Sequence, residues 1–201
     1  MGFIISLIIF FFAVIIHEIS HGLVAYKLGD PTAKYSGRLT LNPFVHIDPV
    51  GTIILPIVLI LMNSPVIFGW AKPVPVNFWN LKNPQRDMIW VGLAGPLANI
   101  LLGLLLILAL KSPFTTNIFL SDILKTAIII NLVLAIFNLI PIPPLDGSRV
   151  LMGLLPRETA IGYSMLEPFG FLIVFMLLFF GLFERIIWPI VAFFLKILNV
   201  Y

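Results

Sequence analysis

The first 16 residues of this 201-residue sequence, MGFIISLIIFFFAVII, contain no charged side chain. A membrane-spanning helix needs about 20 predominantly apolar residues, and this stretch extends to residue 26 with a single acidic side chain. Hydrophobic residues make up 60% of the chain and charged residues 10%, whereas soluble domains carry about a quarter charged residues. The chain is therefore expected to be an integral membrane protein.

Long apolar stretches recur along the chain. Each of them predicts a membrane helix, and they cover residues 3–26, 88–110, 123–140 and 165–183. The first stretch has no basic segment before it and no small-residue cleavage site after it, so we expect it to be retained rather than removed as a signal peptide. We expect an all-α polytopic membrane protein with about five or six membrane segments, in a single integral membrane domain spanning residues 1–201.

Two segments leave the number of crossings open. The apolar stretch 50–70 is interrupted by Pro56 and by Asn63-Ser64-Pro65. It either crosses once or dips into the membrane and returns, so that residues around 50–76 form a re-entrant or extended segment. The tail 186–198 is either a short span or a helix lying in the membrane interface.

Charge and cysteine content exclude several classes of protein. The net charge is only +3 and the basic residues are scattered, which argues against nucleic acid as a partner. The chain has no cysteine, so disulfides, thiolate catalysis and cysteine-based zinc sites are excluded, and any metal site must use histidine and carboxylate ligands. Basic residues are equally frequent in the polar segments 27–49 and 72–86, so charge gives no membrane orientation from the sequence alone.

The polar segment HEISH, residues 17–21, follows directly on the first apolar stretch. His17 and His21 lie one helical turn apart and project from one face, with Glu18 beside them. This spacing favours a zinc site with a general base. Ionisable side chains at membrane depth are costly unless they are paired or face a polar cavity, which argues against a chance polar cluster.

A catalytic zinc site takes three protein ligands, so two histidines leave one ligand to find. The candidates are His46, Asp30, Asp48, Asp87, Asp122 and Asp146. Asp146 stands out because the prolines of the preceding NLIPIPPL cannot continue a helix, which predicts a broken helix at 139–146 with extended backbone beside a polar space. The alternative is that Asp146 only caps the next helix.

Three segments taken together resemble the site-2 protease family of intramembrane zinc metalloproteases. They are HEISH at 17–21, GPLAN at 95–99 and NLIPIPPLDG at 138–147, and their order and separation match the family. The segments GRLTLNPFVHIDPVG and FGWAKPVPVN are similar to the compact prokaryotic members, which carry no PDZ or CBS domain. The resemblance covers nearly the whole chain. It implies a multi-pass protein of a prokaryotic cell membrane that acts on transmembrane protein substrates in the lipid bilayer.

The resemblance also implies roles for individual residues. His17, His21 and Asp146 would hold one Zn²⁺ per chain, and Glu18 would act as general base and acid while zinc-activated water hydrolyses peptide bonds in or near transmembrane segments, as in regulated intramembrane proteolysis. Two polar helpers near the site are implied as well, namely Asn99 and Asn138. From its chemistry, Asn99 either donates to the oxyanion or hydrogen-bonds between helices.

The segment GWAKPVPVN, residues 69–77, alternates valine with proline, a pattern suited to an edge strand. A helical substrate must be unwound before its peptide bonds can be attacked, so Val74, Pro75 and Val76 are candidates to bind it as an added strand. The alternative is a rigid connector.

For the whole chain, the alternative function is a membrane protein that binds or transports zinc without proteolysis. Glu18 in a general-base position and the lack of internal repeats disfavour it.

Overall fold

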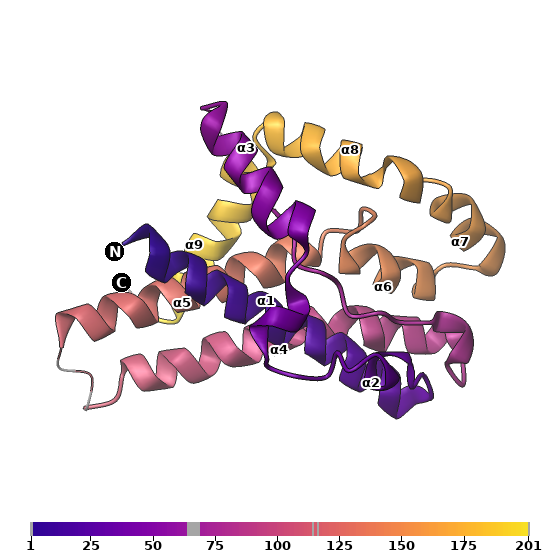
Figure 1. The fold of residues 1–201 in the computed structure, drawn as a ribbon, viewed down its shortest axis with the longest axis horizontal. Coiled ribbons are helices and arrows are strands. Elements are labelled where there is room, and N and C mark those ends of the chain that lie inside the picture. The colour runs from indigo at the N-terminus through magenta and orange to yellow at the C-terminus, as the bar shows by residue number, and fades with distance from the viewer. Residues whose placement is uncertain (1, 64–68, 114, 116, 201) are drawn as a thin grey trace.

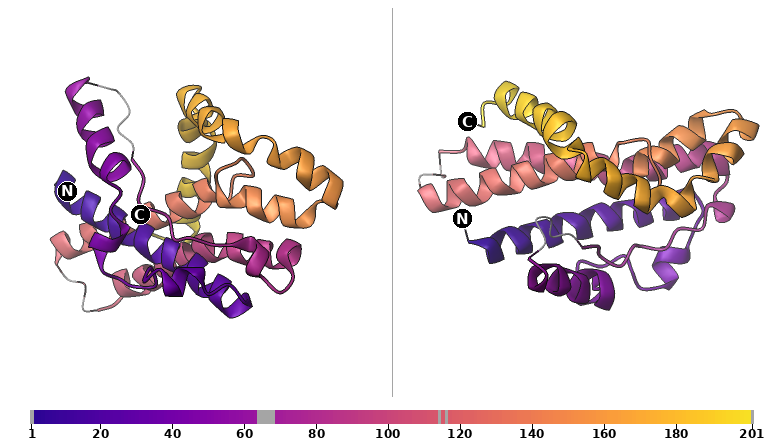
Figure 2. Two further views of the ribbon diagram at one scale, coloured as in Figure 1. Left: turned by 45° about the vertical axis from the view of Figure 1, so that its right-hand side comes forward. Right: turned by 90° about the horizontal axis from the view of Figure 1, so that it is seen from above.

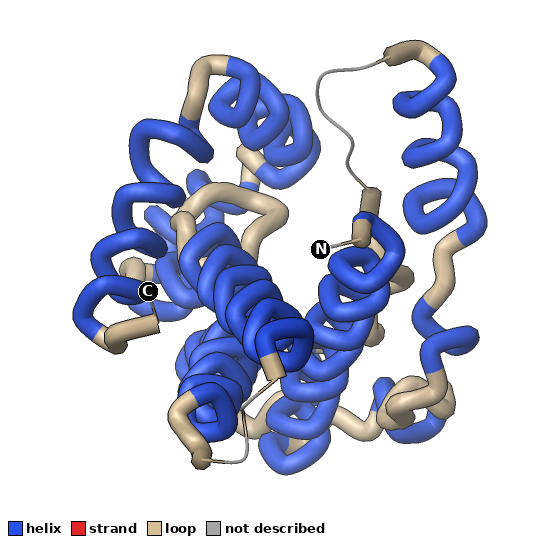
Figure 3. Tube along the Cα trace, turned by 90° about the vertical axis from the view of Figure 1, so that its left-hand side faces the viewer, coloured by secondary structure: helices blue, strands red, loops and turns tan. Residues whose placement is uncertain are grey.

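The computed structural model describes residues 2–63, 69–113, 115 and 117–200. Every regular element in this described part is helical, as the sequence predicts, and no strand is drawn in Figure 3. In chain order the elements are α1 (Phe3–Leu28), α2 (Thr32–Tyr35), η1 (Pro43–His46), η2 (Pro49–Ile54), α3 (Leu55–Leu61), η3 (Phe78–Asn80), α4 (Pro84–Leu110), α5 (Ile118–Asn138), α6 (Asp146–Leu154), α7 (Arg157–Ser164), α8 (Glu167–Phe179), η4 (Phe183–Ile187) and α9 (Trp188–Ile197).

Three long apolar helices, α1, α4 and α5, form the frame of the molecule (Figure 1). Helix α4 contacts both α1 and α5 and also packs against the short helix α6. Helix α9 packs back against α5, where Ile128 and Leu132 meet Val191 and Leu195 in a buried apolar cluster. This arrangement, seen from two further sides in Figure 2, places α4 and α5 beside α1, and the start of α6 also lies beside α1.

The number of membrane spans differs from the sequence-based expectation. Helices α1, α4 and α5 are long and apolar enough to cross a membrane, and α7 with α8 could form a fourth span that is bent by 66°. The expected five or six segments are therefore not confirmed; the described residues hold three such helices, or up to four. The tail divides into η4 and α9, and the ten residues of α9 reach about 15 Å, roughly half the thickness of the hydrocarbon core.

The apolar segment after residue 49 leaves the frame and returns to it. The Trp70 N–H donates to the carbonyl of Gly51 (3.1 Å), and the Thr52 hydroxyl donates to the carbonyl of Trp70 (2.8 Å). A Cβ atom on Gly51 would lie 2.2 Å from the Trp70 ring, so the outgoing and returning segments of this hairpin approach as closely as a glycine allows. Of the two alternatives for 50–70, the contact between Gly51 and Trp70 favours the return over a single crossing; residues 64–68 lie outside the described part.

Residues 70–77, called the strap below, lead from this hairpin past α1 in an extended path. The strap forms no regular strand, but it is fixed at four backbone N–H groups. These N–H groups and their acceptors are Trp70 to Gly51 O (3.1 Å), Lys72 to His46 O (2.8 Å), Val74 to Glu18 Oε2 (2.8 Å) and Asn77 to Asp30 Oδ2 (2.7 Å). The strap is thus anchored on the hairpin, on α1 and on the turn after α1.

The predicted break at 139–146 is confirmed, because α5 ends at Asn138 and α6 begins at Asp146. The intervening backbone is not extended as expected but turns tightly, with hydrogen bonds from Ile142 to Ile140 and from Leu145 to Ile142. Helix α8 covers this turn closely, since a Cβ atom on Gly170 would lie 2.2 Å from the Pro143 carbonyl oxygen. The prolines end α5, and the turn then redirects the chain so that α6 starts beside α1 and α4.

Candidate metal centre

Helix α1 supplies two imidazoles on one face. Its residues form an unbroken apolar helix, so His17 and His21 project from the same side one turn apart. Both side chains are buried, with relative exposures of 5% and 8%, and their ring centroids lie 4.7 Å apart.

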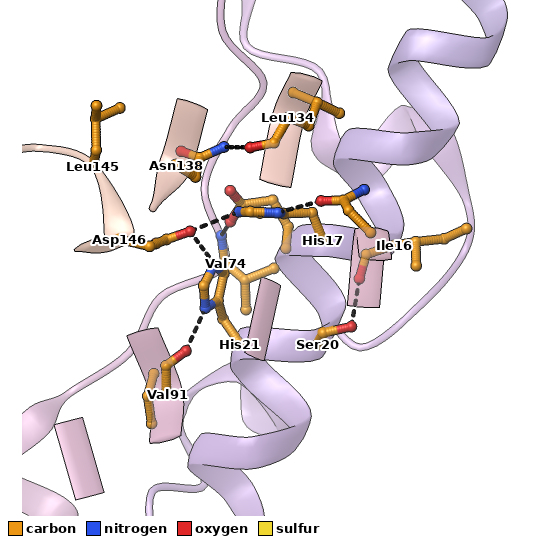
Figure 4. A network of polar contacts seen from close by, with 12 residues as sticks. Ile16, His17, Ser20, His21, Val74, Val91, Leu134, Asn138, Leu145 and Asp146 are labelled. Carbon is orange, nitrogen blue, oxygen red and sulfur yellow. Dashed lines mark hydrogen bonds and ion pairs between the residues drawn. The ribbon is translucent and has the colours of Figure 1, made fainter. Parts of the chain in front are cut away.

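Asp146 meets both imidazoles from the start of α6. Its Oδ2 atom lies 2.9 Å from His17 Nε2 and 3.2 Å from His21 Nε2, and Figure 4 shows the three side chains converging. Asp146 is the first residue of α6, whose N-cap is Leu145, and no side-chain hydrogen bond caps the helix. The capping alternative for Asp146 is therefore not what the geometry favours.

The outer nitrogen of each ring is held by an oxygen. His17 Nδ1 lies 2.6 Å from Asn99 Oδ1, and His21 Nδ1 lies 2.7 Å from the carbonyl oxygen of Val91. Both oxygens can only accept a hydrogen bond, so both rings carry a proton on Nδ1 and direct Nε2 toward Asp146. This arrangement is the one that metal-binding histidines normally adopt.

The convergence of these three groups fits a metal ion. The Oδ2 atom of Asp146 is buried, has no hydrogen-bond partner and faces two Nε2 atoms, and it joins them in a group of ligand atoms within 4.8 Å of one another. Tetrahedral zinc with bonds of about 2.0–2.1 Å separates its ligand atoms by about 3.3 Å, which is close to the observed 2.9 and 3.2 Å. Two imidazoles and a carboxylate are also a donor set that zinc accepts in catalytic sites.

Helix α4 leaves room for this centre through a glycine. A Cβ atom on Gly95 would lie 2.4 Å from His21 Nε2 and 2.5 Å from His17 Nε2. From the sequence, Gly95 is expected only to let two helices pack closely. In the structure, the space that a side chain at residue 95 would fill is the space where the Nε2 atoms of His17 and His21 meet.

Glu18 lies beside the centre and contacts the strap. Its Oε2 accepts a hydrogen bond from the backbone N–H of Val74 at 2.8 Å. The Val74 side chain is buried and packs over Gly22, where a Cβ atom would lie 2.7 Å from Val74 Cγ1. The HEISH and PVPV segments, which lie far apart in the sequence, are therefore in contact in the structure.

The amide side chains near the centre differ in their surroundings. Asn99 is fully buried, and its amide nitrogen donates to Ala13 O (3.2 Å) and to Asn131 Oδ1 (2.8 Å). Both amide hydrogens are thus used, which favours a positioning role for Asn99 over donation to an oxyanion. Asn138 is half-buried and donates to Leu134 O at 2.9 Å, a bond drawn in Figure 4.

Sequence reasoning missed Asn131. It is 1% exposed on α5 and hydrogen-bonds to Asn99. The available signal was a carboxamide in the middle of a predicted span, where a polar group needs a partner.

The other candidate ligands lie in different surroundings. His46 is fully buried and its Nε2 lies 2.9 Å from Thr40 O, while Asp48 accepts hydrogen bonds from Val50 N and Gly51 N at the start of η2. Asp87 accepts a hydrogen bond from Asn83 N. The group of His17, His21 and Asp146 is the one cluster of metal-ligating side chains found among the described residues.

Asp30, another candidate from the sequence, serves the turn after α1. Burial raises the pKa of its carboxyl group, but hydrogen bonds from Thr32, Asn80 and Asn77 favour the charged form more strongly and hold the pKa below its usual 3.8. Asp30 therefore fixes the end of the strap to the end of α1 as a carboxylate.

Known proteins resemble this chain over most of its length. Residues 111–181 match "Peptidase family M50". The chain is 40% identical to "Putative zinc metalloprotease YwhC" of Bacillus subtilis (strain 168) over 183 residues, which cover 86% of this chain and 79% of that protein. It is 32% identical to "Putative zinc metalloprotease Rip2" of Mycolicibacterium smegmatis, covering 81% of this chain and 62% of the relative.

A more distant relative is "Zinc metalloprotease MJ0392" of Methanocaldococcus jannaschii, 28% identical, of which the chain spans 34%. No solved structure matches the chain at comparable significance. The names of the relatives give no support to the zinc-transport alternative, and the bacterial relatives support a prokaryotic membrane as its location. With its apolar spanning helices and its His-His-Asp cluster, the chain belongs to peptidase family M50, the site-2 protease family of membrane-embedded zinc metalloproteases.

Proposed function

We propose that this intramembrane zinc protease holds its zinc with His17, His21 and Asp146 and hydrolyses peptide bonds in or near transmembrane segments of membrane proteins. The observation that carries the proposal is the buried, unpartnered Oδ2 of Asp146, which faces the Nε2 atoms of two imidazoles. Without a cation between them, a carboxylate oxygen and two nitrogen lone pairs would repel one another. The single membrane domain 1–201 predicted from the sequence carries all of these groups.

Glu18 is the proton carrier in this proposal. Zinc supplies Lewis acidity at such a site, polarising the scissile carbonyl and making water more acidic. Glu18 takes a proton from the attacking water while the water oxygen bonds to the carbonyl carbon of the substrate. Glu18 later gives that proton to the departing amine as the C–N bond breaks. The hydrogen bond from Val74 holds one carboxylate oxygen of Glu18 and leaves the other for this transfer.

The distribution of basic residues supports a cytoplasmic position for the site end of the molecule. Because the 50–70 hairpin returns, both polar segments that frame it lie at the same end of the bundle, as the bond from Lys82 N to Leu28 O shows. Eight of the twelve basic residues belong to the segments at that end, namely Lys27, Lys34, Arg38, Lys72, Lys82, Arg86, Arg149 and Arg157, and the other four, Lys111, Lys125, Arg185 and Lys196, lie outside these segments. The positive-inside rule then assigns the end of α1 to the cytoplasm.

The depth of the metal centre follows from the helix rise. His21 and His17 lie seven and eleven residues before the end of α1 at Leu28, which places them about 10 and 16 Å inside that end. A peptide bond cleaved there lies within the membrane, between its cytoplasmic face and its midplane.

Substrate binding is proposed for the strap, at Val74, Pro75 and Val76. In an extended chain alternate N–H groups point to the same edge, and those of Trp70, Lys72 and Val74 already bond within the protein. The N–H of Val76 has no acceptor in the described part of the chain and is available to an unwound substrate. Val76→Pro, which removes this N–H, should lower cleavage while zinc stays bound, whereas Val76→Ala, which keeps it, should cleave normally; equal cleavage by both would refute the role.

Zinc analysis of detergent-purified protein tests the ligand set. Wild-type protein should hold one zinc per chain, Asp146→Ala should lose it, and the control His46→Ala should retain it. Glu18→Gln should retain zinc but cleave a transmembrane substrate at least about 100-fold more slowly. Undiminished zinc in a folded Asp146→Ala protein would remove Asp146 from the ligands, and unchanged cleavage by Glu18→Gln would remove its catalytic role.

A further inference from the structure

A chain of buried amide hydrogen bonds leads from the metal centre into the middle of α5. Asn131 Nδ2 donates to Ala127 O (2.9 Å), Asn99 Nδ2 donates to Asn131 Oδ1 (2.8 Å), and His17 Nδ1 lies 2.6 Å from Asn99 Oδ1. Asn99 and Asn131 are 0% and 1% exposed. The chain therefore joins α1, α4 and α5 without contact with solvent.

The direction of every hydrogen bond in this chain is forced. The far end is the backbone carbonyl of Ala127, which can only accept, so the amide nitrogen of Asn131 must face it and the amide oxygen must face Asn99. Asn99 must in turn present its nitrogen to Asn131 and its oxygen to His17. The carbonyl of Ala13 accepts the second amide hydrogen of Asn99 and supports the same orientation.

We propose that Asn131 is a positioning residue for zinc binding, acting through Asn99 on the orientation and tautomer of His17. The proposal rests on the proposed role of His17 as a ligand. With the Asn99 oxygen facing it, His17 keeps its proton on Nδ1 and its Nε2 lone pair directed at Asp146. If the Asn99 amide turned over, its nitrogen would face His17 and its oxygen would face the oxygens of Asn131 and Ala13, so His17 would lose both its acceptor and its preferred tautomer.

A purely structural role for Asn131 makes a different prediction. Amide pairs between membrane helices contribute to helix association, and loss of such a pair would lower stability without a specific effect on the metal. The proposed role predicts weaker zinc binding in a protein that is still folded. The two roles are therefore separated by zinc affinity and by the state of His17, not by stability.

The decisive variants are Asn131→Leu, which removes the acceptor, and Asn131→Asp, which keeps an oxygen for Asn99 in either protonation state. Apparent zinc affinity, measured by competition with a chelator in detergent, should fall in the leucine variant by about tenfold, the lower end of the usual range for a residue behind a metal ligand, because Ala13 O still holds Asn99. The aspartate variant should bind zinc as wild type does. Thr126→Val is the matched control, because it removes from the same helix a hydroxyl whose hydrogen bond within the described part of the chain goes to Asp122 O, and it should leave the affinity unchanged.

The three histidines of the chain make a second readout practical. In metal-free protein labelled with ¹⁵N-histidine, the His17 signal, assigned by its loss in His17→Ala, should show a single tautomer protonated at Nδ1 in wild type and a mixture in Asn131→Leu. If that variant does not fold, Asn131→Met offers the same loss of the acceptor. Unchanged zinc affinity in a folded leucine or methionine variant, or equal losses in the leucine and aspartate variants, would overturn the proposal. Zinc missing from wild type, or retained by His17→Ala, would instead refute the role of His17 itself.

Discussion

The two histidines of the metal centre stand on one helix yet are held in place by different kinds of group. His21 is hydrogen-bonded to the backbone carbonyl of Val91, a group that no side-chain substitution removes. His17 is hydrogen-bonded to the side chain of Asn99, which is in turn hydrogen-bonded to the side chain of Asn131. The orientation of one ligand is therefore built into the path of α4, while that of the other depends on two replaceable side chains.

The largest effect on zinc binding is expected from a substitution that clashes with both histidines. Gly95→Ala would place a methyl group 2.4 Å from His21 Nε2 and 2.5 Å from His17 Nε2, in the space where the ligand atoms meet. We expect this variant to bind no measurable zinc and to be inactive. Gly103→Ala on the same helix is the control, because its Cβ atom would meet only Asn131 Cβ at an ordinary 3.9 Å. Metal analysis of both folded proteins measures the difference, and normal zinc in Gly95→Ala would show that no metal ion occupies the space beside Gly95.

The difference between the two histidines can be tested by substituting the residues that hydrogen-bond to their Nδ1 atoms, Asn99 for His17 and Val91 for His21. Asn99→Leu removes the acceptor for His17 and should weaken zinc binding by about 10–100-fold. Val91→Ala shortens a buried side chain but leaves its carbonyl in place for His21, so it should reduce thermal stability with little change in zinc affinity. Chelator competition on the two purified variants measures the difference. Equal losses of affinity would show that the histidines are not held differently.

A smaller effect is expected at Glu18, between the two ligands. Gly22→Ala would place a methyl group 2.7 Å from Val74 Cγ1 and from Leu39 Cδ2, and so push the strap away from Glu18. We expect cleavage to slow by about tenfold, a fraction of the ~10²–10⁴ that a general base contributes, with zinc still bound. Adding Val74→Ala removes one of the two clashing side chains and should restore part of the rate. A Gly22→Ala protein that cleaves at the wild-type rate would show that contact with the strap is unimportant.

The smallest effect on the centre is expected from Asp30, which fixes the turn after α1 and should not distinguish the two histidines. Asp30→Asn loses an acceptor oxygen for its several donors and should cost about 1–3 kcal/mol of stability while zinc affinity is unchanged.

The pH dependence follows from the lowered pKa of Asp30. Its contribution to stability is complete above the usual 3.8 and is lost only as the pH falls through the lower value of the folded state. Thermal unfolding in detergent should therefore show no loss from this group between pH 7 and about pH 5, and an acid-induced loss that is smaller in Asp30→Asn. A loss from Asp30 near neutral pH would contradict this assignment.

Much of the fold could be predicted from the chain because lipid imposes a simple rule on it. Long apolar stretches must become helices that satisfy their own backbone, and this requirement gave the stretches that become α1, α4 and α5. The same requirement does not predict the number of spans, because an apolar segment has the same hydropathy whether it crosses the membrane or folds back. The contact between Gly51 and Trp70, which closes the hairpin, joins residues 19 positions apart and leaves no periodic signal.

Local helix geometry, which can be read from the sequence, accounts for half of the metal centre. A helical turn places His17 and His21 on one face whatever surrounds them, and the prolines before Asp146 must break α5. The packing of the helices places the start of α6 beside α1 and leaves room for a metal ion at Gly95. It also brings Val74 to Glu18 and Asn131 to Asn99. These contacts join groups up to 129 positions apart, between His17 and Asp146. They arise from the packing of whole helices, which local sequence periodicity does not encode.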